Sequence, residues 1–266
     1  METVSVIIPT FNRAALLERA VRSALEQGDA VLEVLVCDDG STDDTRTRTA
    51  AIGDARVKWV DGPRAGRPAV PRNRGINAAA GEWLAFLDDD DRWLPGKLKR
   101  QFEAMRRTGA QASCTNAQRM APDGKDRGTY FTDGDAILAL ADLLPVNRVI
   151  CSSVIARRDH VLRCGGFPEA PDLRALEDYA LWLRLSLAAR FAYCAEPLVA
   201  YMDAPEGSVR SDSLPLPVQR DRVLSDLWRW GRAGRFGPGQ RSLVTRYLRG
   251  ARRSAGRPLH HWLFLR

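Results

Sequence analysis

The fold of this chain is most constrained by a repeated pattern in which a short apolar run ends abruptly in polar residues. Four such runs lie at 4–8, 34–37, 57–60 and 83–87. Unbroken apolar runs of this length are typical of strands that are buried on both faces of a sheet. The segments between them have helical character, and strands that alternate with helices imply right-handed crossovers. The pattern therefore predicts an α/β protein with a mainly parallel, Rossmann-like central sheet flanked by helices.

Local signals predict where several of the helices begin and end. The first helix is expected to end before Gly28. Ser41 or Thr42 is expected to cap the second helix, because their hydroxyl groups can accept a hydrogen bond from the first turn. A further helix is expected to begin at Pro95, whose fixed φ suits the first helical position.

The second half of the chain does not alternate strictly between strands and helices. Its expected elements are strands at 112–115, 149–156 and 197–201 and helices at 159–164 and 177–189. We therefore expect one main domain over residues 1–205, with a nucleotide-type half (1–115) and a half (116–205) that forms the other wall of a cleft. Residues 203–217 are rich in Pro, Ser and Asp, which indicates a linker. Residues 206–266 are expected to form a basic helical extension.

Polar residues follow three of the four apolar runs. They are Pro9–Arg13, Asp38–Ser41 and Asp88–Asp91. Ligands of open parallel sheets bind outside the carboxyl ends of the strands, so we expect these segments to face one crevice. Four adjacent carboxylates repel one another unless they are solvated or bridged, and Mg²⁺ or Mn²⁺ would relieve that repulsion. Acidic runs are more often solvated loops, but the position after a buried strand favours a metal site.

Several classes of enzyme lack their sequence signatures in this chain. The first strand is not followed by G-x-G-x-x-G, and no G-x-x-x-x-G-K-[ST] occurs, which argues against a dinucleotide oxidoreductase and a P-loop kinase. No G-x-S-x-G is present, and the histidines are His160, His260 and His261, which gives no support to a serine hydrolase.

A series of motifs carries a resemblance to one known family. The motifs are Val4–Arg13, Val36–Asp43, Arg72–Asn77 with Gly81 and Glu82, Phe86–Asp91, Ser152–Arg158, Gly165–Glu169 and Glu177–Leu185. In this order and spacing they closely resemble family 2 glycosyltransferases of the GT-A fold, over residues 4 to about 201. The motif after Gly166 runs Pro-Glu where the family commonly has Asp-Glu. The Gln-X-X-Arg-Trp motif of processive synthases is absent, which favours a single-addition enzyme.

The resemblance implies transfer of a sugar, with inversion, from a nucleotide-sugar such as a UDP-sugar. The acceptor would be a hydroxyl of a glycan or lipid-linked molecule in cell-surface polysaccharide biosynthesis. Pro9, Thr10, Phe11, Asn12 and Asp39 match the positions that hold the base, and Asn73 matches a position that lines the nucleotide pocket.

The same resemblance assigns the acidic cluster. Asp88 and Asp90 would be the two acids of the family's Asp-X-Asp, with Asp90 on a divalent cation, Mn²⁺ or Mg²⁺, that takes up charge on the leaving nucleoside diphosphate. Because the middle residue is also an aspartate, Asp89, the division of work among the three stays open. In this assignment Asp88 binds both the metal and the donor, and Asp89 contacts the donor.

Inversion by a single displacement needs one base that takes the proton of the acceptor hydroxyl. Asp178 is the candidate, and Glu177 is the alternative. Taken alone, this acidic pair would more simply be the first turn of a helix, where the helix dipole favours carboxylates.

The positive charge of the chain lies in its C-terminal part. From Leu227 to Arg266 there are ten Arg and no Lys, Asp or Glu, so the formal net charge of +7 belongs to this segment. Apolar residues recur between the arginines at near-helical spacing. A basic amphipathic helix of this kind either lies on an anionic membrane surface or packs on the catalytic domain, and the pattern does not separate the two.

The remaining expectations concern location and alternative functions. Five scattered cysteines without C-x-x-C spacing indicate reduced thiols, and the start of the chain does not resemble a signal peptide. We therefore expect a cytoplasmic protein, with peripheral contact to the inner face of the plasma membrane as an option. An Asp88 phosphotransferase would require Asp-X-Asp-X-Thr, which Arg92 and Trp93 interrupt. An RNA-binding role would rest on the tail alone, and no nucleic-acid partner is expected.

Overall fold

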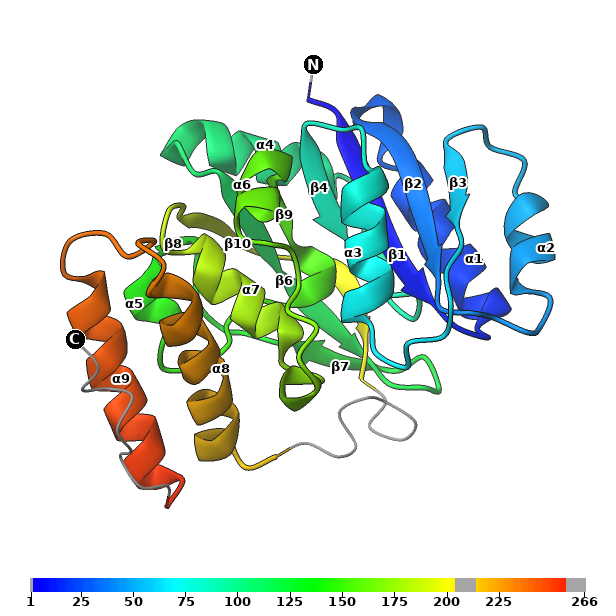
Figure 1. Ribbon diagram of the computed structural model, residues 1–266. Coiled ribbons are helices and arrows are strands. Elements are labelled where there is room, and N and C mark those ends of the chain that lie inside the picture. The colour runs from blue at the N-terminus through cyan, green and yellow to red at the C-terminus, as the bar shows by residue number, and fades with distance from the viewer. Residues whose placement is uncertain (1, 204–213, 257–266) are drawn as a thin grey trace.

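A computed structural model of the protein describes residues 2–203 and 214–256 (Figure 1). Most of the expected linker and the aromatic end around Trp262 lie outside the described residues. The strands are β1 (Val4–Thr10), β2 (Val31–Asp38), β3 (Val57–Val60), β4 (Trp83–Phe86), β5 (Arg92–Trp93), β6 (Ala112–Met120), β7 (Asp126–Thr129), β8 (Ala136–Leu138), β9 (Ile155–Arg157) and β10 (Phe191–Met202). The helices are α1 (Ala14–Leu25), α2 (Thr45–Ala50), α3 (Ala69–Ala78), α4 (Lys97–Thr108), α5 (Leu140–Leu143), α6 (Arg158–Arg163), α7 (Glu177–Leu185), α8 (Leu216–Gly231) and α9 (Gln240–Ser254).

The described strands form one sheet in the order β3-β2-β1-β4-β9-β6-β10-β5, with β7 on β6 and β8 on β10. β1 is parallel to β2 and to β4, and β2 is parallel to β3. The expected α/β fold is confirmed, and the four strands β3, β2, β1 and β4 are parallel to one another. In the second half β9 inserts antiparallel between β4 and β6, so the sheet becomes mixed there.

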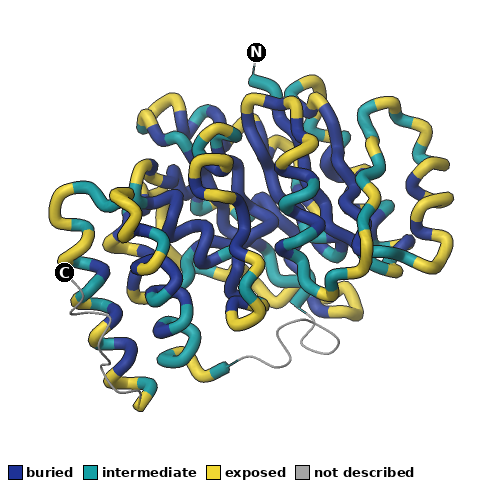
Figure 2. The backbone as a smooth tube through the Cα atoms, viewed as in Figure 1, coloured by how far each residue is buried: buried dark blue, intermediate teal, exposed yellow. Residues whose placement is uncertain are grey.

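The sheet is buried on both faces, as its apolar strands predict. In β1 the side chain of Ile7 packs into one core cluster with α3 and α7, whereas Val6 and Ile8 pack into another with α1 and α4. This alternation follows from the two-residue period of a strand. Figure 1 shows α3 and α7 in front of the sheet and α1 behind it, and Figure 2 shows the central strands as mostly buried.

Several expected element boundaries were wrong. Helix α2 begins at Thr45 rather than after Ser41 or Thr42, because both of those residues bond the turn after β1 instead. Helix α4 begins at Lys97, since Gly96 before it has a φ of +79° that no helix can include. The expected strand at 149–156 is a 3₁₀ turn followed by the short strand β9, and the expected helix at 177–189 ends at Leu185.

The C-terminal extension forms a helical pair that packs on the catalytic unit. Its buried apolar residues are Val223, Leu224, Leu227, Trp228, Val244, Leu248 and Ala251. They belong to the same core cluster as α7, so they are not available to a lipid surface. For the described helices the packing alternative is confirmed, and the membrane-bound amphipathic helix is not supported. No helix in residues 2–203 and 214–256 has the length and apolar character needed to span a bilayer.

Two buried ion pairs hold the helical pair in place. Arg184 of α7 makes a bidentate contact with Asp226 of α8, at 2.8 and 3.0 Å. Arg252 of α9 donates to Asp221 of α8 at 3.1 Å. Buried charges are tolerated only when they are paired, so these contacts fix how α8 and α9 sit on α7.

We predict that Asp226→Ala lowers the free energy of unfolding by about 3–5 kcal/mol, because it leaves the Arg184 guanidinium buried without its carboxylate. Urea denaturation followed by circular dichroism measures the change. Asp29→Ala removes an exposed carboxylate and should change stability by no more than about 0.5 kcal/mol. Equal stability of the two variants would mean that the α7–α8 pair contributes nothing.

Candidate active site

A cavity of about 380 Å³ lies at the carboxyl ends of β1, β2 and β4. The expected site residues that line it are Pro9, Thr10, Phe11, Asp39, Asp88, Asp89, Asp90, Glu177 and Asp178. The register explains this convergence, since Thr10 at the end of β1 is level with Asp38 at the end of β2. The segments that follow the three strands therefore meet in one crevice, as expected for a parallel sheet.

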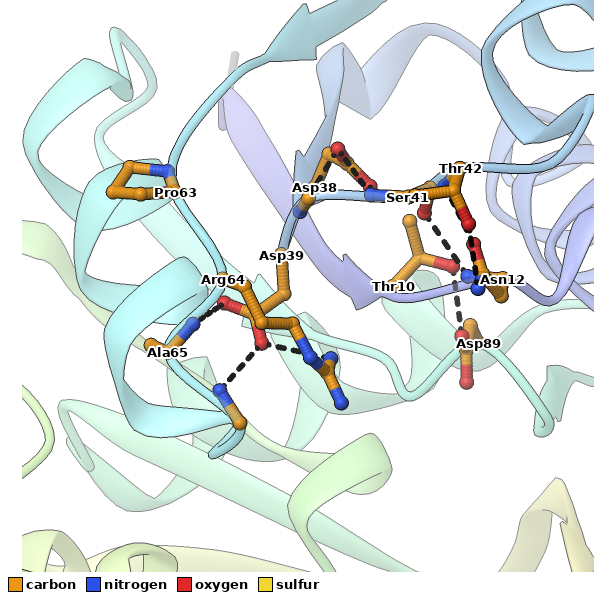
Figure 3. Close-up of polar contacts among 12 residues, drawn as sticks. Thr10, Asn12, Asp38, Asp39, Ser41, Thr42, Pro63, Arg64, Ala65 and Asp89 are labelled. Carbon is orange, nitrogen blue, oxygen red and sulfur yellow. Dashed lines mark hydrogen bonds and ion pairs between the residues drawn. The ribbon is translucent and has the colours of Figure 1, made fainter.

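The aspartates after β4 have different surroundings. Asp89 is buried and accepts hydrogen bonds from Thr10 at 2.8 Å and from Arg13 at 3.0 Å (Figure 3 shows the contact with Thr10). Asp88 and Asp90 remain 26% and 32% exposed. All three line the cavity, but Asp89 also joins β1 to the acidic loop, and Asp88 and Asp90 are the more exposed carboxylates.

Burial and mutual repulsion perturb the ionisation of this loop. Burial raises the pKa of Asp89 to about 7. Burial, and after it the negative charge of Asp88, raises the pKa of Asp90. Burial raises the pKa of Asp91 well above its ordinary value. A cation in the cavity would favour the ionised forms of the groups that face it.

A divalent cation fits the donor groups of the cavity. The described residues contain no group of three or more His, Cys, Asp or Glu side chains that could hold a metal. Mg²⁺, however, is usually bound by only one or two carboxylates, with water and substrate phosphates as its other ligands. Asp88 and Asp90 supply two carboxylates on the cavity side, and the repulsion between them is what a cation would relieve.

Ser152 and Asp91 form a buried support beneath the acidic loop. The Ser152 hydroxyl accepts the backbone N–H of Asp88 at 3.1 Å and donates to Asp91. The second oxygen of Asp91 accepts the backbone N–H of Met202 at 2.8 Å, at the end of β10. These contacts tie the acidic loop to a strand of the second half of the chain.

Asp39 organises the loop that follows β3. Its carboxylate accepts the backbone N–H groups of Ala65 and Gly66, both at 2.9 Å, and pairs with Arg64 at 3.1 Å (Figure 3). The Arg64 guanidinium in turn lies 3.2 Å from the centroid of the Phe11 ring. This stack places a cation and an aromatic ring together on the wall of the cavity.

Two expected site residues are not part of the cavity lining. Asn12 bonds the turn after β2, with its side-chain oxygen accepting the N–H of Thr42 at 2.8 Å (Figure 3). Asn73 exchanges two hydrogen bonds with the backbone of Phe167, at 2.8 and 2.9 Å. The amide of Asn73 clamps α3 to the turn that follows α6, and its assignment to the nucleotide pocket stays a prediction.

Glu177 and Asp178 are separated by their surroundings. Glu177 is buried and accepts a hydrogen bond from Arg72 at 3.1 Å, and the same guanidinium contacts Asp88. Asp178 is only partly buried, and its Oδ1 accepts the N–H of Tyr179 at 2.6 Å. Both carboxylates line the cavity, but Glu177 is engaged in an internal ion pair.

Among the arginines of the cavity wall, three form ion pairs that the sequence did not predict. They are Arg13, Arg64 and Arg72, which pair with carboxylates of the expected site. Arg13 and Arg72 lie inside the motifs of the family resemblance, which was the available signal. Their partners are 16 or more residues away along the chain, so only the folded structure identifies them.

A match to a family model decides the class of this protein. Residues 5–160, more than half of the chain, match the model of glycosyl transferase family 2. The chain is a family 2 glycosyltransferase. The resemblance seen in its motifs is thereby confirmed.

The glycosyltransferase is similar to proteins of bacterial polysaccharide synthesis. It is 34% identical over 243 residues to the succinoglycan biosynthesis protein ExoO of Rhizobium meliloti, covering 83% of this chain and 67% of the relative. It is 29% identical over 227 residues to the UDP-Glc:alpha-D-GlcNAc-diphosphoundecaprenol beta-1,3-glucosyltransferase WfaP of Escherichia coli. This match covers 85% of this chain and 87% of the relative. S. aureus TarS 1-349 in complex with UDP-GlcNAc superposes with a TM-score of 0.75 at 19% identity, covering 95% of this chain and 73% of TarS 1-349. This likeness confirms the GT-A fold.

We predict that Asn73→Ala lowers the free energy of unfolding of the glycosyltransferase by about 1–3 kcal/mol, because the backbone groups of Phe167 lose their partner. Denaturant titration measures this loss. Asn12→Ala, which removes more exposed hydrogen bonds, serves as the matched control and should cost less. A smaller effect for Asn73 than for Asn12 would contradict the structural role of Asn73.

Proposed function

We propose that this glycosyltransferase moves a sugar from a nucleoside diphosphate sugar, with UDP as the first nucleotide to test, to a hydroxyl of a glycan or lipid-linked acceptor. The observation that carries the proposal is a single cavity whose wall contains Asp88, Asp90 and Asp178 together. We place the reaction in cell-surface polysaccharide synthesis because the relatives are named for such pathways. Family membership favours this function over the phosphotransferase and RNA-binding alternatives.

The donor would bind in the half formed by residues 1–115. Pro9, Thr10 and Phe11 line the wall next to Asp39, where the stacked Phe11 and Arg64 suit a planar base. Both carboxylate oxygens of Asp39 accept hydrogen bonds from the loop that carries Arg64. Its contribution to donor binding therefore includes holding that part of the cavity wall in place. Residues 116–205 would supply the acceptor side.

Asp88 and Asp90 would hold Mn²⁺ or Mg²⁺ together with the donor diphosphate. When bound, such a cation stabilises the negative charge that develops on the leaving nucleoside diphosphate. Arg13 and Arg72 keep the two carboxylates at the cavity wall. Asp89 stays directed toward Thr10 and is expected to shape the loop rather than to bind the metal.

Asp178 is proposed as the base of an inverting single displacement. It would accept the proton of the acceptor hydroxyl as that oxygen attacks the anomeric carbon from the face opposite the leaving group. Glu177 is the weaker candidate because its carboxylate already balances the buried Arg72. A lipid-linked acceptor would bring the enzyme to a membrane surface, and we propose the cytoplasmic face, where nucleotide-sugars are the expected donors.

We predict that Asp90→Ala abolishes transfer and removes the Mn²⁺-dependent part of UDP binding while leaving the fold intact. Asp90 is partly exposed and is not part of the buried support, so its loss should cost little stability. Calorimetric titration of UDP with and without Mn²⁺ measures the effect. Asp29→Ala is the matched control, and a metal effect that survives in Asp90→Ala would remove the metal assignment.

We predict that Asp178→Asn slows transfer by about 10²–10⁴-fold, because the amide keeps the shape but accepts no proton. UDP and Mn²⁺ binding should stay as in the wild type. Glu177→Gln should instead lower stability, since it leaves Arg72 with one carboxylate less. Near-normal turnover of Asp178→Asn, measured with saturating donor and acceptor, would rule this residue out as the base.

A further inference from the structure

A second cavity, of about 490 Å³, adjoins the proposed donor cavity. The two cavities share Cys151, Arg174, Ala175, Asp178 and Tyr201 in their walls. The proposed base therefore lies where they meet. Ala175 has a φ of +62°, an uncommon backbone conformation for a residue other than glycine, and it lies in the loop that leads into α7 at this junction. Strained residues of this kind cluster at binding sites.

The walls of the second cavity are aromatic and polar. Tyr130, Phe131, Tyr179 and Tyr201 contribute rings, and the rings of Tyr130 and Tyr201 meet edge to face with their centroids 5.7 Å apart. Tyrosine presents an apolar ring face and a polar hydroxyl, which suits a ligand such as a sugar that has both kinds of surface. The first turns of α8, the loop before α7 and the end of β10 come together at the lower side of the molecule in Figure 1.

The charged side chains of this wall are Arg174, Arg222 and Asp178. Within the described residues neither arginine forms an ion pair with a carboxylate, in contrast to Arg13 and Arg72 of the donor cavity. Arg222 donates from Nη1 to the backbone carbonyl of Asp172 at 2.9 Å, which holds its guanidinium against the loop before α7.

We propose that the second cavity binds the acceptor, and that Arg222 and Arg174 recognise a phosphate or diphosphate group attached to the acceptor sugar. The inference rests on the proposed function and names its acceptor class. Guanidinium groups bind phosphate oxygens through two parallel hydrogen bonds. Two arginines that have no acidic partner among the described residues match the charge of a diphosphate better than that of a single carboxylate.

The order of residues along the cavity fits this assignment. Asp178 and Arg174 lie at the junction, and Arg222 lines the second cavity alone. The reacting hydroxyl would sit at Asp178, the sugar ring against Tyr130 and Tyr201, and the anionic end at Arg222. The relative WfaP is named for an acceptor whose sugar carries a diphosphate.

Calorimetry on the whole protein saturated with UDP and Mn²⁺ tests the inference, because the donor cavity is then filled. Three acceptor analogues are titrated: an alkyl diphosphate ester of α-GlcNAc, the neutral alkyl glycoside of the same sugar, and an alkyl glucuronide. We expect the diphosphate ester to bind at least about tenfold more tightly than the neutral glycoside, from the usual strength of charge-assisted hydrogen bonds. Failure of UDP to bind in the first step would instead count against the proposed function.

Variants test whether the arginines of the second cavity cause the tighter binding of the diphosphate ester. Arg222→Gln should weaken binding of the diphosphate ester by about tenfold to a hundredfold and leave the neutral glycoside unchanged. Arg222→Lys should retain part of the affinity, and Arg174→Gln should weaken it as well. Arg229→Gln, an exposed position on the same helix, is the matched control and should change nothing.

Four outcomes would overturn the inference. They are equal binding of the ester and the neutral glycoside, tighter binding of the glucuronide, binding of none of the three, and an Arg222→Gln variant with wild-type affinity for the ester. Thermal midpoints of all variants show whether a loss of binding reflects a loss of folding, and Arg174→Gln provides the second measurement if Arg222→Gln does not fold.

Discussion

The geometry of the site depends on the two ion pairs that the buried guanidinium of Arg72 forms. Its side chain is 6% exposed and lies between Asp88, after β4, and Glu177, at the start of α7. A buried cation is tolerated only with close acidic partners, so α3, the acidic loop and α7 cannot move apart without exposing an unpaired charge. Asp178 follows Glu177 directly, and its place in the cavity wall is therefore set by the same ion pair.

The acidic loop illustrates how one residue type acquires several roles. Asp89 and Asp91 are buried. Their carboxylate oxygens accept hydrogen bonds from β1, Arg13, Ser152 and the end of β10. Asp88 and Asp90 stay partly exposed at the cavity wall. The two inner carboxylates thus support the two outer ones, which the cavity presents to a ligand. Burial raises the pKa of both inner carboxylates, and the negative charge of neighbouring aspartates raises it further.

The helical extension has two structural functions at once. Helices α8 and α9 cover one face of the core through apolar residues and buried Arg–Asp pairs. The beginning of α8 also contributes Gln219 and Arg222 to the wall of the second cavity. Of the arginines of the described extension, Arg222 lines this cavity, and it precedes the arginine-rich segment that starts at Leu227.

The sequence alone determined the β-α units of the first half and the convergence of three polar segments at one edge. Strand periodicity is a local property, and the polar residues directly after β1, β2 and β4 locate the crevice without any distant contact. The family motifs likewise identified Asp88, Asp90 and Asp178 as residues of one cavity. These features depend on neighbours in the chain and on the topology of a parallel sheet.

Only the tertiary structure decided how the side chains divide their work. The amide of Asn73 clamps Phe167, 94 residues away, a contact that its motif does not reveal. Glu177 and Asp178 are adjacent in sequence, yet one neutralises Arg72 and the other is partly exposed at the cavity. The amphipathic tail had two interpretations because a helix that packs on a core and one that binds lipid carry the same apolar stripe. Long-range contacts distinguish these cases, and local patterns do not contain them.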